Sequence, residues 1–487
     1  MRHTRLSVIS AAAVLAATLT LDPLGAMAPS GPAYALQGAR VFTAAGAPME
    51  NATVVIRDGV IEDVGAGVAA PADAVVIDAS GMHVYPGLID MTNDTPIDTG
   101  DPPAAAGGRG GGGGGRGGGQ AQGFATLEEA ERAKRANILR ADFAAAEHLQ
   151  TSSPELAQLA AAGITTVLAV PSSGIVKGQS ALVNIALPPD DPQISTVASY
   201  RRGLAVVKAP VAMHINMAGR GGGQGYPNSL LGTIAFTRQA LLDAQWQQQA
   251  LVQYEKASAR GPRPIVEPPL TALQPVLARQ LPAAFDAMEA REIDRALAMA
   301  AEFNLDPIVI GAQQADLRAA DLVKAKARVI FSVAFPGGAA GGGGGRGGGG
   351  RGGGGGSPSL RQLKEQAAMP KAPAALLQAG VPFAFTSGNL NPAEFVRNVG
   401  RVIKDGGLAP DAALRALTID AARMAGAADR LGTIERGKIA NLVVTEGDLF
   451  DGGAIRHVFV DGHPVDVDVP SPPAGGGRGR GGGAARR

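Results

Sequence analysis

Residues 431–444 read LGTIERGKIANLVV, and this stretch sets the architecture expected at the C-terminal end of the chain. Short apolar or β-branched runs bounded by turn residues are typical of β-strands. Beyond residue 430 we expect three of them, at Leu431–Ile434, Ala440–Thr445 and Ile455–Val460, with a turn at Asp461-Gly462. This pattern predicts a small antiparallel sheet.

The N-terminal part has the same character. Strands are expected at Ala39–Phe42, Thr53–Ile56 and Val75–Ile77, with Arg57-Asp58-Gly59 forming a hairpin turn. We therefore expect the two ends of the chain, residues 36–80 and 426–470, to pair into one small β-sandwich.

The middle of the chain, residues 81–425, alternates continuous apolar strands with helices. Such strands are typical of a parallel sheet covered on both faces, and about eight of them over some 300 residues fit a closed (β/α)8 barrel. The sequence thus predicts an α/β fold, a TIM-type barrel beside the β-sandwich. The expected barrel strands are Val84–Asp90, Ile164–Pro171, Ala205–Lys208, Val211–Ile215, Pro282–Phe285, Pro307–Ile310, Val329–Ala334 and Val381–Phe385.

Several motifs resemble the amidohydrolase superfamily, most closely its imidazolonepropionase-like and Xaa-Pro dipeptidase-like members. MHVYPGLID at 82–90 resembles the first barrel strand of that family, and AGITTV at 162–167 resembles its second. LTIDAAR at 417–423, followed by the 431–444 stretch, is similar to its return from the barrel to the sandwich. The resemblance implies hydrolysis of carbon–nitrogen bonds in small molecules by water that one or two divalent metals, such as zinc, activate.

The metal-ligand positions depart from the family pattern. The family holds its metals with His-x-His after the first strand, a Lys or Glu, two further His and a late Asp. Here Met91-Thr92-Asn93 occupies the His-x-His position, and Gly388 stands where the Asp is expected. Methionine and glycine offer no hard ligand, and the chain has only six His and no Cys. The standard metal site is therefore expected to be lost, and zinc is expected only if another site exists.

Three residues remain as candidates at the barrel mouth. His214 ends an apolar strand and either binds a metal, acts as a base or forms structural hydrogen bonds. Asp286 is either a ligand or base, or the cap of the following helix. Asp90 either faces the mouth or packs at its strand end.

The composition excludes several classes of protein. The chain has 487 residues, and most of its 69 Gly lie in Gly/Arg tracts at 107–119, 219–225, 337–356 and the tail 471–487. We interpret the first three as flexible insertions in barrel loops and the tail as disordered. A net charge of +1 and tracts without aromatics argue against nucleic-acid binding.

The first residues predict export. Arg2, His3 and Arg5 precede an apolar run from Leu6 to Leu21, followed by small-x-small sites. This pattern is typical of a signal peptide, here residues 1–35 with cleavage expected after Ala35 rather than Ala28. The protein is then periplasmic or secreted, and we expect no membrane span after cleavage.

Two functional hypotheses follow. The first is an exported hydrolase of carbon–nitrogen bonds that uses unusual ligands such as His214 and Asp286. The second is a catalytically inactive relative that acts as a binding or partner subunit, as a homo-oligomer or paired with an active relative, because fold alone never establishes chemistry. Nothing in the sequence identifies the substrate.

Overall fold

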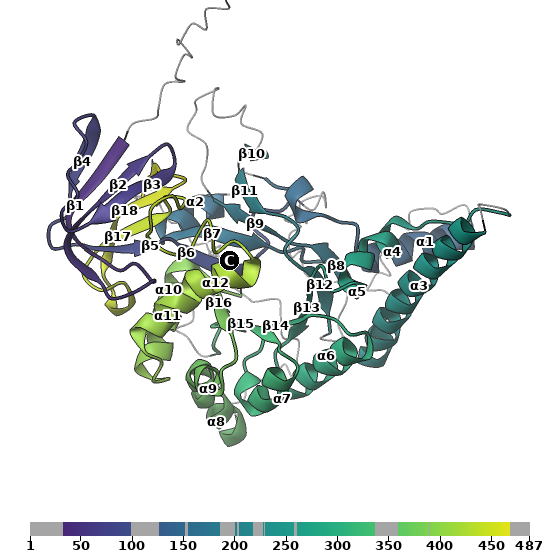
Figure 1. The fold of residues 1–487 in the computed structure, drawn as a ribbon. Helices are drawn as coiled ribbons and strands as arrows, with labels where there is room; N and C mark the ends of the chain where they lie inside the picture. Colours follow the sequence, from purple (N-terminus) through teal and green to yellow (C-terminus); the bar gives the residue numbers. More distant parts are fainter. Residues whose placement is uncertain are drawn as a thin grey trace, which may run out of the picture.

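The computed structural model describes residues 33–98, 126–150, 154–185, 200–201, 204–217, 227, 229–257, 261–336, 359–388 and 390–467. The predicted signal peptide up to residue 32 lies outside the described residues, as do the three Gly/Arg tracts and the tail. The described elements form an α/β fold with three sheets, and helices lie along the second and third of these (Figure 1).

The first sheet joins the two ends of the chain. A strand from the C-terminal part pairs antiparallel with one from the N-terminal part, so that Val443 lies opposite Tyr85. The sheet has its own core, which includes Leu36, Val54 and Phe459. In spatial order its strands are β19 (His463–Val465), β18 (Ala454–Val460), β17 (Leu442–Glu446), β5 (His83–Pro86), β1 (Ala33–Val41), β2 (Met49–Arg57) and β3 (Val60–Gly65), and β4 (Ala74–Asp78) pairs with β1.

The other two sheets contain the strands predicted for the barrel. The second sheet runs β10 (Tyr200–Arg201), β11 (Leu204–Lys208), β9 (Ala181–Asn184), β7 (Ile164–Ala169) and β6 (Leu88–Asn93). The third sheet runs β16 (Phe383–Thr386), β15 (Arg328–Ser332), β14 (Pro307–Gly311), β13 (Ala283–Ala287), β12 (Met213–Asn216) and β8 (Val176–Gln179).

The strands of the second and third sheets do not form the predicted closed barrel of parallel strands. Strands β12 to β16 are parallel to one another, and β6 is parallel to β7, but β8 and β9 run antiparallel to their neighbours. Only Ser180 separates β8 from β9, so one nearly continuous stretch of chain contributes a strand to each of the two sheets. Within the described residues no ladder joins β6 to β16, and side chains make that contact instead.

One glycine explains where the first predicted barrel strand divides. The expected strand Val84–Asp90 is split into β5 and β6 at Gly87, because the chain passes there from the first sheet to the second. A Cβ atom at Gly87 would collide with the side chain of Thr165, so glycine permits this close passage.

The apolar core has two layers around the second and third sheets. An inner cluster between the strands contains Ile89, Met91, Leu168 and Ile308. A larger outer cluster, which includes Phe285, lies between strands and helices. The helices are α1 (Leu127–Ile138), α2 (Pro154–Ala161), α3 (Leu230–Lys256), α4 (Pro268–Ala272), α5 (Gln274–Leu277), α6 (Ala290–Glu302), α7 (Ala319–Lys324), α8 (Leu360–Ala368), α9 (Ala372–Ala379), α10 (Pro392–Lys404), α11 (Pro410–Leu417) and α12 (Ile419–Ala425), with 3-10 turns η1 (Ala145–Glu147), η3 (Ala315–Arg318), η4 (Met369–Lys371) and η5 (Leu449–Asp451).

Local sequence explains the ends of these helices. The Asn391 side chain accepts a hydrogen bond from the Ala393 amide, and Pro392 takes the first turn of α10. Glu289 and Glu292 form a capping box at the start of α6. Among the described helices, none combines the length and apolar character needed to cross a membrane.

Candidate functional site

The carboxyl ends of the parallel strands are where proteins of this architecture bind ligands. The structure places all the predicted site residues on or just after these strands. Asp90, Met91 and Asn93 lie on β6, His214 on β12, Asp286 on β13, and Gly388 two residues after β16.

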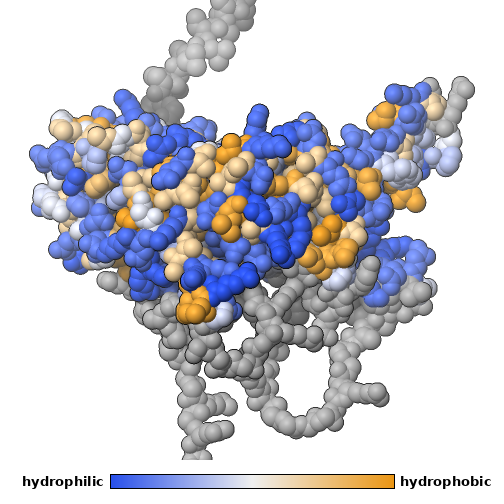
Figure 2. All heavy atoms as spheres, turned by 90° about the horizontal axis from the view of Figure 1, so that it is seen from below, coloured by the Kyte–Doolittle hydropathy of each residue, from blue (hydrophilic) through white to orange (hydrophobic). Residues whose placement is uncertain are grey.

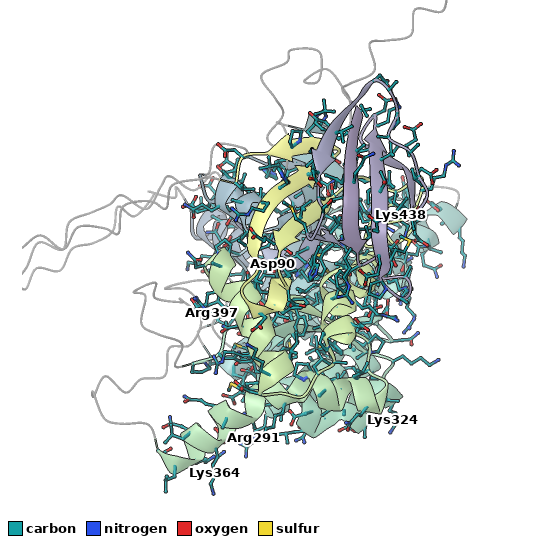
Figure 3. The ribbon with its side chains drawn as sticks, turned by 90° about the vertical axis from the view of Figure 1, so that its left-hand side faces the viewer. Asp90, Arg291, Lys324, Lys364, Arg397 and Lys438 are labelled. Atoms are coloured by element: carbon teal, nitrogen blue, oxygen red, sulfur yellow. The ribbon has the colours of Figure 1, made fainter. Side chains whose placement is uncertain are left out.

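Asp90 is buried with its carboxylate surrounded by donors. Its Oδ1 accepts hydrogen bonds from the Ser387 amide and the Thr386 hydroxyl, both at 2.9 Å. Its Oδ2 accepts from the Ser387 hydroxyl at 2.6 Å and from the Asn93 amide at 3.2 Å. Burial raises the pKa of the Asp90 carboxyl, while these donors act in the opposite direction. The carboxylate ties β6 to β16 across the gap between their sheets, inside the body of the molecule (Figure 3).

Met91 and Asn93 are likewise engaged in structural contacts. Met91 is fully buried in the inner apolar cluster with Leu168 and Ile308. Asn93 donates to Asp90, and its own Oδ1 accepts from the Thr95 amide at 2.9 Å. The two positions thus contribute packing and a hydrogen-bonded turn.

Gly388 has no space for a larger side chain. Its φ of +60° lies in the left-handed region, and a Cβ atom would sit 2.7 Å from the Ser332 Oγ and 3.3 Å from the Ala334 Cβ. A carboxylate at this position would therefore require Ser332 and Ala334 on the neighbouring chain segment to move.

His214, Lys177 and Asp286 form a second polar group on three adjacent strands. Lys177 on β8 makes an ion pair with Asp286 on β13, and β12, which carries His214, lies between them. His214 is completely buried, and neither ring nitrogen has a hydrogen-bond partner among the described residues. Burial, reinforced by the charge of Lys177, lowers the pKa of His214 to about 3, so the ring is neutral at physiological pH.

Comparisons with known proteins bear on these positions. The amidohydrolase family model matches residues 363–465, which include α10, α11, α12 and the return into the first sheet. This segment, about a fifth of the chain, is therefore similar to the amidohydrolase family.

The curated relatives match over a short segment. A dihydroorotase from Citrifermentans bemidjiense is 46% identical over 56 residues, 12% of this chain and 13% of that enzyme. The chain thus matches about an eighth of the length of this curated relative.

Solved structures match almost the whole chain. An amidohydrolase from Thermotoga maritima MSB8 has a TM-score of 0.65 and 21% identity, covering 89% of this chain and 99% of that one. At this identity the likeness concerns the fold. A Xaa-Pro dipeptidase with bound methionine is also similar, with a TM-score of 0.48 and 16% identity over 89% of this chain and 99% of its own.

The superfamily implies a divalent metal, and we asked whether the residues at the mouth fit one. Asp90 has its oxygens occupied by donors, Met91 is packed in the core and Gly388 has no side chain. His214 and Asp286 offer two donors, but Lys177 already neutralises the carboxylate of Asp286. Within the described residues no three His, Asp or Glu gather closely enough to hold a metal ion. The described residues at the mouth do not fit the metal that the superfamily implies.

Sequence reasoning missed the partners of Asp90. Thr386 and Ser387, which are not among the candidates from the sequence, both donate to the buried carboxylate. A signal was available, because two hydroxyl residues end one buried strand and a carboxylate ends another. Their pairing could not be derived, since it depends on how β6 and β16 meet.

The space around Gly388 leads to a prediction. We expect Gly388→Ala to destabilise the protein by about 2 kcal/mol, because both the positive φ and the Ser332 hydroxyl oppose a Cβ atom. Adding Ser332→Ala should recover part of that loss, measured by urea denaturation. If Gly388→Ala were as stable as wild type, the segment that contains Ser332 and Ala334 would move aside without a measurable cost.

Proposed function

We propose that this chain is an exported member of the amidohydrolase superfamily that has lost the standard metal site and acts as a binding or partner subunit. The observation that carries the proposal is that, within the described residues, no three His, Asp or Glu gather closely enough to hold a metal ion, and the nearest carboxylate on β6, Asp90, is engaged in structural hydrogen bonds. Its two oxygens accept five hydrogen bonds, from Thr92, Asn93, Thr386 and, twice, Ser387, and those from β16 and Ser387 join two sheets. Because these hydrogen bonds use the Asp90 carboxylate to stabilise the fold, they support the proposal that the strand ends no longer serve as a metal site.

The finer architecture is part of the same proposal. We infer that the parallel strands of the second and third sheets are a barrel whose seam between β6 and β16 is held by side chains. The contacts of Asp90 with Thr386 and Ser387, and of Thr92 with Thr386, support a seam of this kind. The separate core of the first sheet supports its prediction as a β-sandwich.

Export rests on the sequence of residues 1–32. The described strand β1 begins at Ala33, and both Ala33 and Ala35 are buried. Cleavage after Ala35 would remove the first three residues of β1, so the fold favours the alternative site after Ala28. A periplasmic or secreted location remains the proposal.

One observation favours a second candidate function, a hydrolase with an unusual site. His214 is buried with two unpartnered ring nitrogens beside the Lys177–Asp286 ion pair. An unsatisfied buried polar group costs roughly 1–3 kcal/mol, and such costs are often retained where a group has a functional role. This candidate would use His214 as a site residue once a movement of the surrounding chain exposed its ring to a small-molecule substrate.

Metal content tests the proposal. The full-length protein, purified and dialysed against zinc or manganese and then against buffer, is expected to retain far less than one ion per chain by plasma mass spectrometry. An amidohydrolase with an intact His-x-His motif, treated in parallel, serves as the control. Stoichiometric metal would refute the loss of the site, and its disappearance in His214→Gln would favour the second candidate.

Partnership has its own test. If the protein pairs with an active relative, a tagged copy should co-purify from the native envelope with a chain that carries His-x-His. We propose no nucleic-acid partner, in line with the net charge of +1. A copy recovered from the envelope without a chain that carries His-x-His would contradict pairing with an active relative.

A further inference from the structure

Helix α3 presents an uncharged row of side chains, with Leu242 and Trp246 at its centre, that the rest of the described chain leaves exposed. It has 27 residues and is therefore about 40 Å long. It extends from the body of the molecule at the right of Figure 1. Trp246, the only Trp of the chain, is 66% exposed, and Leu242 one turn earlier is 44% exposed. Apolar residues lie beside hydrophilic ones at this end of the molecule in Figure 2.

The charges in the body of α3 are turned toward the protein itself. Arg238 makes two hydrogen bonds to the carboxylate of Glu302 on α6, at 2.7 and 2.8 Å. Asp243 accepts from Arg135 on α1 at 3.1 Å. The outward row of α3 is then uncharged and consists of Ala235, Gln239, Leu242, Trp246, Gln249 and Gln253.

We propose that this outward row is the docking site for a second copy of the chain, with the two α3 helices packed antiparallel. The row is spaced alternately by four and three residues, so it is unchanged when the helix is reversed about the point midway between Leu242 and Trp246. In this arrangement Leu242 of each copy contacts Trp246 of the other, and Gln239 faces Gln249.

The chemistry of the row favours an identical partner. Glutamine side chains both donate and accept, so two copies can pair amide with amide, whereas a charged row would repel its own copy. A surface hollow of about 440 Å³ runs beside Trp246 and is lined also by Gln249 and Gln253; in this register it offers space for the partner's Gln239. A central Trp surrounded by polar residues is the usual composition of an interface hot spot. The inference is independent of the metal site.

Self-association and the fluorescence of the single Trp test the proposal together. Between about 1 and 100 μM the full-length protein is expected to shift from monomer to dimer in sedimentation velocity. Over the same range the emission of Trp246 should move to shorter wavelength as the indole leaves water. Leu242→Glu should weaken association at least a hundredfold and abolish the shift. Leu317→Glu, a matched change at a leucine that is 61% exposed on η3, should leave both unchanged.

A mixing experiment tests the register. Leu242→Glu and Trp246→Lys are each expected to be monomeric, because each homodimer would bury two unpaired charges. An equimolar mixture should form a heterodimer, in which the introduced glutamate of the first variant meets the introduced lysine of the second. At the other end of the same contact, Trp246 of the first variant meets Leu242 of the second. Since only the first variant retains Trp, its emission reports the heterodimer directly.

Three results would overturn the inference. They are a wild-type monomer throughout the concentration range, a dimer insensitive to Leu242→Glu, and a mixture of the two variants that stays monomeric. None of them bears on metal content, so this inference and the proposed function fail separately. Capture of a different protein by α3, without self-association, would also count against it.

Discussion

Asp90→Ala is expected to lower the free energy of unfolding by roughly 3–5 kcal/mol, enough to unfold a marginally stable domain. The substitution removes the shared acceptor of the Ser387 amide, the Ser387 and Thr386 hydroxyls and the Asn93 amide. Each buried donor left without a partner costs about 1–3 kcal/mol, and those hydroxyls that can turn to other acceptors reduce the total. Denaturant unfolding followed by circular dichroism measures the loss.

Two further variants separate the role of Asp90 from that of carboxylates in general. Asp90→Asn keeps an acceptor oxygen for Ser387 and is expected to cost only about 1–2 kcal/mol. Asp63→Ala, at an exposed position of β3, should change stability by less than about 0.5 kcal/mol. If Asp90→Ala were as stable as Asp63→Ala, the seam between β6 and β16 would not depend on this carboxylate.

Much of the strand framework could be predicted from the sequence because its signal is local. The expected strands Pro307–Ile310 and Val329–Ala334 coincide with β14 and β15 to within one or two residues. Both are continuous apolar runs, as strands buried on both faces must be. The glycine at which the chain passes from the first sheet to the second, Gly87, is also visible in the sequence. The sequence alone does not tell whether the strand breaks or only bends there, because that depends on Thr165, which lies against Gly87.

The elements that were missed have weak or misleading local patterns. Strand β8 reads Val176-Lys177-Gly178-Gln179, which has too few apolar residues to be recognised as a buried strand. Conversely, the expected strand Leu431–Ile434 is irregular, since Gly432 adopts a φ of +91° against Ile419 and the Ile434 amide donates to the Thr43 carbonyl. In both cases distant parts of the chain decide the backbone conformation.

The sequence allowed the residue types at the candidate site to be predicted, but it did not allow their hydrogen-bond and ion-pair partners to be predicted. The absence of His at the expected positions could be counted in the sequence, and so could the isolation of His214 among six histidines. That Lys177 would pair with Asp286 depends on the antiparallel course of β8 beside β12, which no local pattern indicates. The residue types expected at the mouth could therefore be named from the sequence, and the structure was needed to place their contacts.

The second large effect is expected from His214 on acidification. Above pH 6.5 the ring is neutral in both the folded and unfolded states, so it adds no pH dependence. Below pH 6.5 the unfolded chain takes up a proton, whereas the folded protein, with its pKa lowered to about 3, does not. The folded state therefore loses about 1.4 kcal/mol per pH unit, close to 3 kcal/mol between pH 6.5 and 4.5.

His214→Leu removes both this loss and the unpartnered ring nitrogens. We expect the variant to be more stable than wild type by about 1–2 kcal/mol at pH 7.5 and by about 4 kcal/mol at pH 4.5, by thermal and urea unfolding across that range. His457→Leu, at a half-buried position on β18, is the matched control and should run parallel to wild type. If the stability of His214→Leu depended on pH in the same way as that of wild type, His214 would have to take up a proton in the folded wild-type protein, and the prediction would be wrong. A histidine whose removal stabilises the protein has no structural reason to be there, so the gain predicted here would be the best argument that His214 is kept for contact with a ligand.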